Sequence, residues 1–194
     1  SSDVCSSDLT VHGTRASVIV PPARVVAPGT PVGLERRAVA VDVVQAVGMY
    51  AIVDGEAAGV PLVEGRRLEL ARVAAAITQT LTRTAKVVSA LEGVVFTGPP
   101  SSEGPGGADM RAITVYDGGA MDRSPGGLAS AALLAVVDAM GLADPTRPFV
   151  VEGPRGTSVA VRVECRAEID GGPAIVPEIS ADVYQVGESV WFPD

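Results

Sequence analysis

Stretches rich in β-branched and small apolar residues predict strands in the first part of the chain. They cover residues 16–20, 38–44 and 49–53, and in 38–44 the valines stand at every second position, the period of a strand with one buried face. Gly48 separates the last two stretches, and the segment APGTPVG at 27–33 has the Pro and Gly content of a turn. The pattern predicts an antiparallel meander over residues 15–54, with a turn at 27–33.

Two segments change to a helical period. Residues 66–83 place apolar side chains close to one helical face, with arginines and threonines elsewhere: Leu68, Val73, Ile77 and Leu81. This pattern is typical of an amphipathic helix lying on a sheet. Residues 128–140 are apolar nearly all round, and Gly141 follows them. We therefore predict a buried helix that ends at this glycine.

Further strands alternate with loops in the rest of the chain. We predict them at residues 93–98, 110–118, 149–153, 157–165, 174–186 and 189–192. The Gly, Pro and Ser content of residues 98–109 marks a surface loop, in which we place no site. Neither an internal repeat nor a linker divides the sequence. The pattern predicts an α+β fold in which strands wrap around one central helix and a second helix lies outside.

Composition narrows the classes of partner. The chain has 194 residues, a formal net charge of −8 and a pI near 4.7, which opposes binding to nucleic acid or to an anionic membrane surface. No apolar run reaches the roughly 20 residues that a membrane span requires. With one His and no ligand cluster at metal spacing, we predict no metal site. The expected partner is a small molecule, and we expect no cofactor.

The two cysteines are predicted to play no chemical part. Cys165 continues the period-two series of Val159, Val161 and Val163, so we predict a core position for its side chain. The other thiol, Cys5, lies in the segment SSDVCSSDL, residues 1–9, which resembles the translated constant end of a short-read sequencing adapter. We interpret this segment as an artefact foreign to the protein. Without a disulfide framework, a reducing compartment, the cytoplasm, is predicted.

The turn before the buried helix, residues 122–127, has the features of a small-ligand site. The first amides of a helix carry partial positive charge and have no partner within the helix, so they bind carboxylates or phosphates. Two glycines let a ligand approach the backbone closely, and Asp122 could hold an ammonium group. The turn therefore suits a zwitterionic amino acid. The alternative is an ordinary Asp and Ser-Pro turn that caps a core helix.

The literal sequence of this turn resembles that of a known family. MDRSPGGLASAALLAVVDAMG at 121–141 is similar to the second active-site segment of the proline racemase family, which reads Asp-Arg-Ser-Pro-Cys-Gly-Thr-Gly-Thr-Ser-Ala. VAVDVVQAVGMYAIVD at 39–54, FVVEGPRGTSVAVRV at 149–163 and AIVPEISADVYQVGESVWFPD at 174–194 resemble three further segments of the family, in the same order. The chain is therefore identified as a member of this family of proline racemases, 4-hydroxyproline epimerases and trans-3-hydroxyproline dehydratases.

The resemblance implies the fold of diaminopimelate epimerase, with two similar halves, each a β-barrel around a central helix, and a homodimeric assembly. It assigns residues 10–180 to the second half and residues 181–194 to a terminal strand that returns to the first half. The family's first catalytic segment, Met-Cys-Gly-His, is absent from this chain. His12 lacks the neighbouring Cys of that segment, so we expect it to be exposed or at a junction and not catalytic.

The family roles carry over only in part. The resemblance makes Asp122 the ligand of the substrate amine, Gly127 a carboxylate-binding amide and Leu128 the position of a supporting Thr. Gly126 stands where the family has its second catalytic Cys, and the triplet Gln-Ala-Val at 45–47 replaces a Phe-Gly-Gly motif. Racemisation needs one group to remove the α-proton and another to return a proton to the opposite face. Glycine can do neither, so no catalytic side chain is predicted in this segment.

These departures favour elimination over racemisation. Elimination of water from trans-3-hydroxyproline needs one base for the α-proton and room for the departing hydroxyl group, which a glycine provides. We predict a fragment of a cofactor-independent enzyme acting on proline or hydroxyproline, closer to a trans-3-hydroxyproline dehydratase than to a two-base racemase, and inactive as an isolated chain. The alternatives are an inactive family member that binds an imino acid or another small zwitterion, and a structural or interaction protein.

Overall fold

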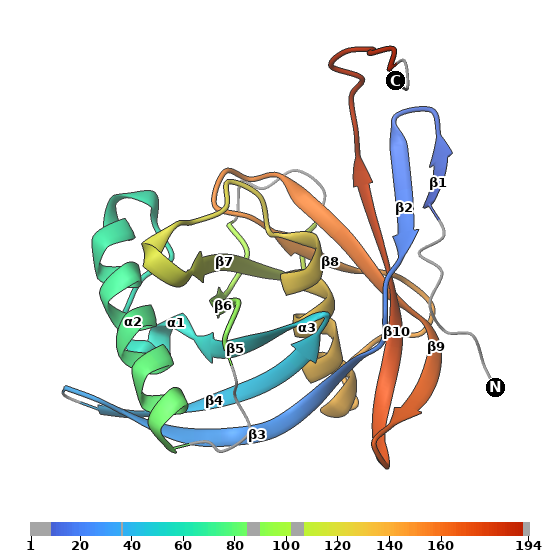
Figure 1. The fold of residues 1–194 in the computed structure, drawn as a ribbon. Helices are drawn as coiled ribbons and strands as arrows, with labels where there is room; N and C mark the ends of the chain where they lie inside the picture. The colour runs from blue at the N-terminus through green and yellow to red at the C-terminus, as the bar shows by residue number, and fades with distance from the viewer. Residues whose placement is uncertain (1–8, 36, 85–89, 102–106, 192–194) are drawn as a thin grey trace.

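The strands form one sheet that closes on itself (Figure 1). The computed structural model describes residues 9–35, 37–84, 90–101 and 107–191. The strands are β1 (Leu9–His12), β2 (Arg15–Ile19), β3 (Ala23–Leu34), β4 (Arg37–Ala46), β5 (Gly48–Asp54), β6 (Gly93–Gly98), β7 (Met110–Tyr116), β8 (Phe149–Glu152), β9 (Ser158–Ile169) and β10 (Gly172–Asp182). They pair in the order β1-β2-β10-β3-β4-β5-β6-β7-β8-β9, and β9 also pairs with β10. Strands β3 to β10 therefore make a closed barrel, which confirms the predicted α+β barrel.

Two parallel strand pairs explain where the helices lie. β5 pairs in parallel with β6, and β7 with β8, whereas the other neighbouring pairs are antiparallel. A parallel pair needs a long crossover connection. The helices α1 (Gly55–Ala58) and α2 (Arg67–Thr84) lie in the first crossover, and α3 (Gly127–Ala139) forms the second. Of the meander predicted for residues 15–54, the part from β3 to β5 is confirmed by antiparallel pairing, but the strand at 16–20 is not part of it, because β2 pairs with β1 and β10.

The helix α3 fills the interior of the barrel, as its sequence predicted. Residues 129–137 are all buried, and they pack against strands β3, β4, β9 and β10. Alanine predominates on this helix, which lets strands approach it from every side. Gly141, with φ of +72°, ends the helix: its N–H donates to the carbonyl of Asp138, and the N–H of Leu142 donates to that of Val137.

The helix α2 covers the outer face of the same sheet. Its buried face consists of Leu70, Ala74, Ile77 and Leu81, which pack with Phe96 and Ile113. The prediction that Leu68 belongs to this face is wrong, because Leu68 is 87% exposed. Two residues turn a helix by about 200°, so Leu68 points away from the sheet when Leu70 points toward it.

The segment 27–33 is not the predicted turn but part of strand β3. Its Pro and Gly residues are accommodated by two irregularities in the pairing with β4, between Val25 and Ala27 and between Ala27 and Thr30. Gly29, which has a positive φ of 57°, lies within this irregular part of β3. Proline is tolerated here because β10 pairs with β3 only at Ala23, which leaves the other edge of this part of β3 without a strand partner among the described residues.

Cys165 is exposed, so the prediction that its side chain lies in the core is wrong. The strands β9 and β10 pair Val163 with Pro177 but Cys165 with Val176. One extra residue of β9 therefore forms a bulge, and the side chains beyond it change faces. Consistent with this change, Arg166 faces the helix α3 and donates two hydrogen bonds of 2.7 Å to Asp138.

The hairpin of β1 and β2 and the C-terminal segment 183–191 lie beside one another outside the barrel (Figure 1). Residues 183–191 have no regular secondary structure, so the predicted strand 174–186 ends early, at Asp182, and the described part of the predicted strand 189–192 is contradicted; Tyr184, Val186 and Trp191 are exposed. The assignment of residues 181–194 to another half stays a prediction. The N-terminal segment 1–9 falls outside the described residues except for Leu9, the first residue of β1. Among the described residues, no helix is long and apolar enough to cross a bilayer.

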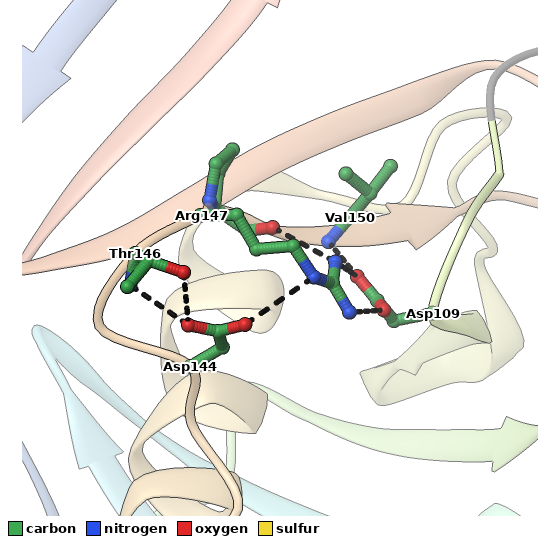
Figure 2. A network of polar contacts seen from close by, with 6 residues as sticks. Asp109, Asp144, Thr146, Arg147 and Val150 are labelled. Carbon is green, nitrogen blue, oxygen red and sulfur yellow. Dashed lines mark hydrogen bonds and ion pairs between the residues drawn. The ribbon is translucent and has the colours of Figure 1, made fainter.

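A charged network anchors the start of β7 to the turn before β8 (Figure 2). Asp109 accepts hydrogen bonds from Arg147 and, at 2.8 Å, from the N–H of Val150. The bond from Arg147 holds the pKa of Asp109 below its usual value, although partial burial opposes this shift. Asp144 accepts from both the N–H and the hydroxyl of Thr146, and these bonds lower the pKa of Asp144.

The enclosure of α3 predicts a large difference between two leucines. Leu134→Ala, which leaves a cavity at a position only 2% exposed, should lower the free energy of unfolding by about 2–5 kcal/mol. Leu68→Ala, at the exposed position of α2, should change it by less than about 0.5 kcal/mol. Urea unfolding followed by circular dichroism measures both values. Equal effects of the two substitutions would contradict the described packing.

The Asp109 network predicts a stability difference that disappears in acid. Because the folded-state pKa of Asp109 is lowered, its contribution is present above the ordinary pKa of about 4 and is lost as the pH falls through the lower folded value. Asp109→Asn should therefore destabilise the protein by about 1 kcal/mol at pH 7 and progressively less below about pH 4. Unfolding curves of both proteins between pH 7 and pH 3 measure the difference, and a constant difference would contradict this explanation.

Candidate functional site

A short return of the chain brings Asp122 back beside strand β7. After β7, the 3-10 turn η2 (Asp117–Gly119) reverses the direction, and the N–H of Tyr116 donates to the carbonyl of Ala120 at 2.8 Å. Met121 then forms an antiparallel bridge with Val115. The next residue, Asp122, accepts a 2.6 Å hydrogen bond from the hydroxyl of Tyr116. The carboxylate is thus fixed at the end of the barrel where α3 begins.

Gly126 is the N-cap of α3 and has a conformation that favours glycine. Its φ is +77° and its ψ is 121°, and no side chain caps the helix among the described residues. The first amides of α3 therefore lack a partner within the helix. The carbonyl of Gly126 accepts from both the N–H and the hydroxyl of Ser130. A Cβ atom on Gly126 would lie 3.1 Å from Oδ2 of Asp122, so the carboxylate and the helix amides adjoin one another.

The end of strand β8 supports the turn from behind. A Cβ atom on Gly153 would lie 2.6 Å from the nitrogen of Pro125, so only glycine lets the two backbones approach this closely. The preceding residue, Glu152, is buried and accepts hydrogen bonds from the N–H and the hydroxyl of Ser101, at 2.9 and 2.7 Å. Nε of Arg111 lies 3.9 Å from the same carboxylate. The loop 98–109, of which residues 102–106 lie outside the description, is thereby held against the strands.

Three further polar side chains lie near the Asp122 carboxylate or beside Gly126. Burial, and then the hydrogen bond to Asp122, raise the pKa of Tyr116 far above its usual value. Burial, and then the negative charges of Glu92 and Asp122, raise the pKa of Tyr50 on strand β5. Both phenols therefore stay protonated at neutral pH. The third group, Oγ1 of Thr114, is fully buried and lies 3.8 Å from the Cβ position of Gly126.

The predicted site residues Asp122, Gly126 and Gly127 come together at the start of α3, where Gly127 is the first residue of the helix. Leu128 is also in this first turn, but its side chain packs against the barrel interior and contributes no polar group. His12 is exposed on β1, as expected, on the arm outside the barrel (Figure 1). Cys165 lies near the other end of α3, beside the Arg166 and Asp138 pair.

Sequence reasoning missed Thr114, Tyr116 and Tyr50. Thr114 and Tyr116 continue the series of Met110 and Ala112, the side of β7 that faces α3. A hydroxyl group in an otherwise apolar inward series is the signal that could have drawn attention to Thr114. Tyr50 comes from a distant part of the sequence, and only the closed barrel brings it near the turn.

Comparisons with known proteins agree with this architecture. A family model described as proline racemase matches residues 13–194. The 4-hydroxyproline epimerase of Brucella abortus (strain S19) and the 4-hydroxyproline 2-epimerase of Brucella suis biovar 1 (strain 1330) are each 30% identical over 161 residues, which cover 79% of this chain and 47% of the relative. The chain thus spans about half the length of the curated relatives that it matches.

Two solved structures share the fold. A probable proline racemase from Agrobacterium radiobacter K84, with bound carbonate, aligns with a TM-score of 0.81 and 22% identity over 96% of this chain and 56% of the other. A hydroxyproline epimerase from Agrobacterium vitis, with bound trans-4-hydroxy-L-proline, aligns with a TM-score of 0.78 and 22% identity over 91% and 52% of the two chains. At this identity the similarity concerns the fold alone.

The close contact behind the turn predicts that Gly153 is needed for its shape. Gly153→Ala should displace the backbone of residues 124–125 and lower the free energy of unfolding by about 1–3 kcal/mol. The amide NMR signals of Gly126 and Gly127 should shift as well. Gly33→Ala is the matched control, because a Cβ atom on Gly33 would meet no atom within 4 Å. Unchanged signals and stability in the Gly153 variant would contradict the support by β8.

Proposed function

The chain belongs to the proline racemase family, and from that premise we propose that the protein containing it binds and transforms a hydroxylated proline, eliminating water rather than inverting the α-carbon. The observation that carries this proposal is the pairing of Asp122 with a helix N-terminus whose cap is Gly126. The relatives named as 4-hydroxyproline epimerases and the fold neighbour with bound trans-4-hydroxy-L-proline support a proline derivative as the ligand.

Binding of such a zwitterion uses the two charges that the site offers. The ring ammonium donates to the carboxylate of Asp122, which already accepts from Tyr116 and can accept further hydrogen bonds. The substrate carboxylate accepts from the amide of Gly127 and from the other free amides at the start of α3, where the helix dipole favours negative charge. The side chain of Leu128 packs against the barrel interior, so it offers the substrate no hydroxyl group, unlike the Thr that the family resemblance implies at this position.

The absence of a side chain at position 126 favours elimination over inversion. Inversion requires a second acid–base group on one face of the substrate, and Gly126 provides none. Elimination requires one base: it removes the α-proton, the electron pair forms the Cα–Cβ double bond, and the C3–O bond breaks as hydroxide leaves. The enamine product then tautomerises to a cyclic imine. We propose that the base belongs to a part of the protein outside this chain, as the family's first catalytic segment implies, and that no cofactor takes part.

A second candidate is a family member that binds an imino acid without transforming it. The observation that favours it is the combined loss of two family groups, with Gly126 in place of the Cys and Leu128 in place of the Thr. Such a protein would keep Asp122 and the helix amides, and hence the recognition of a zwitterion. The family resemblance further suggests a homodimer in the cytoplasm, which we propose for both candidates.

The reaction can be tested on the protein encoded by the complete reading frame. We expect trans-3-hydroxy-L-proline to yield a cyclic imine, and L-proline to show neither inversion nor exchange of its α-proton in D2O, both followed by proton NMR. Asp122→Asn should lower kcat/KM by about 10- to 100-fold, because one charge-assisted hydrogen bond is lost. Racemisation of L-proline would refute the proposal. Binding without any turnover would favour the second candidate, and the 194-residue chain alone should be inactive.

A further inference from the structure

We propose that Thr114 determines specificity at this site, by forming a hydrogen bond with a hydroxyl group of the ligand. The inference rests on the proposed function, because it concerns the same site at the start of α3, and it adds the residue that would distinguish a hydroxylated imino acid from an unsubstituted one. Three observations support it: the burial of the Thr114 hydroxyl, its lack of a partner among the described residues, and its position beside Gly126, near which Asp122 also lies.

The hydroxyl of Thr114 is an unusual group in this structure. Thr114 is 0% exposed, on the side of β7 that faces the barrel interior. Its Oγ1 has no hydrogen-bond partner within the part of the chain that the structure describes. Buried hydroxyl groups in folded proteins almost always have a partner, because leaving one without a partner is unfavourable. A ligand that supplies the missing hydrogen-bond partner would explain a buried hydroxyl at this position.

The hydroxyl of Thr114 lies close to Gly126, at the start of α3. The Cβ position of Gly126 lies 3.8 Å from Oγ1 of Thr114 and 3.1 Å from Oδ2 of Asp122, with Cβ of Ala129 at 3.4 Å. The two oxygen atoms therefore lie near the same point beside Gly126. Because residue 126 is a glycine, no side chain fills this point at the start of α3.

The two oxygen atoms restrict which chemical group can contact both. Oδ2 of Asp122 already accepts a hydrogen bond from Tyr116 and can accept another, so it requires a donor. Oγ1 of Thr114 can donate or accept. A carboxylate is excluded from this place because it would face the Asp122 carboxylate. A hydroxyl group can donate to Asp122 and accept from Thr114, whereas the ring ammonium can only donate to both.

Two substitutions at Thr114 separate these possibilities. Thr114→Val keeps the shape and removes the hydroxyl, and Thr114→Ser keeps the hydroxyl and serves as the matched control. Calorimetry with the protein from the complete reading frame would give dissociation constants for trans-3-hydroxy-L-proline, trans-4-hydroxy-L-proline and L-proline. We expect Thr114→Val to weaken binding of trans-3-hydroxy-L-proline by about 10-fold and to leave L-proline within about 2-fold, since one hydrogen bond is lost. Thr114→Ser should retain the wild-type preference.

Each other outcome has a distinct meaning. A selective loss for trans-4-hydroxy-L-proline alone would support the role of Thr114 and contradict elimination at C3. An equal loss for all three ligands would overturn the inference, because it indicates a contact with the ammonium group or a structural role. Unchanged binding of all three in Thr114→Val would overturn the inference but leave the proposed function intact. If the wild-type protein bound none of them, the proposed function would fail, and the inference with it.

The stability of the ligand-free protein provides an independent check. Because Thr114→Val removes a buried hydroxyl that has no partner among the described residues, it should not lower Tm in the absence of ligand. The variant should instead lose part of the rise in Tm that trans-3-hydroxy-L-proline produces in the wild-type protein. A lower Tm without ligand would show that the hydroxyl serves the fold, which contradicts the inference.

Discussion

The structure depends on enclosing a helix that is apolar on every side. A helix with one apolar stripe can lie on a sheet, as α2 does, but α3 is buried from Ala129 to Val137 and needs partners all round. The sheet provides them only because β10 pairs with both β9 and β3, which closes the barrel. The mixed topology follows from the same requirement, since the crossover between β7 and β8 has to pass through the interior while the crossover between β5 and β6 passes outside.

Enclosing α3 also determines where a ligand can bind. The sides of the helix are covered, and we propose that a ligand binds at its first amides, at one end of the barrel. The chain reaches this end through the bridge between Val115 and Met121, which sets Asp122 beside Tyr116. On the other side, the backbone of Gly153 supports Pro125. The site is therefore a consequence of how the chain enters the barrel, and its carboxylate and amides are positioned by strands β7 and β8.

The sequence predicted those features that depend on neighbouring residues and missed those that depend on strand pairing. The helix periods of α2 and α3 and the glycine at 141 are local, and each was found. The alternation that seemed to place Cys165 in the core was interrupted by a bulge, which exists only in the pairing of β9 with β10. The segment 27–33 joined a strand because its outer edge tolerates proline. Tyr50 could not be assigned to the site, because a period of two does not show which distant strands meet.

Gly126 matters for its backbone conformation as well as for the missing thiol. With φ at +77°, a side chain there would be strained, and it would crowd Oδ2 of Asp122 at 3.1 Å. A change at this position alone would therefore not restore a second acid–base group without moving the turn. The polar groups that remain, namely a carboxylate, two protonated phenols and a buried hydroxyl, can bind and orient a ligand, but Gly126 itself supplies no acid–base group where the family resemblance implies a Cys. The lack of that group is the physical reason for our proposal that this chain recognises the ligand and that a group outside it removes the α-proton.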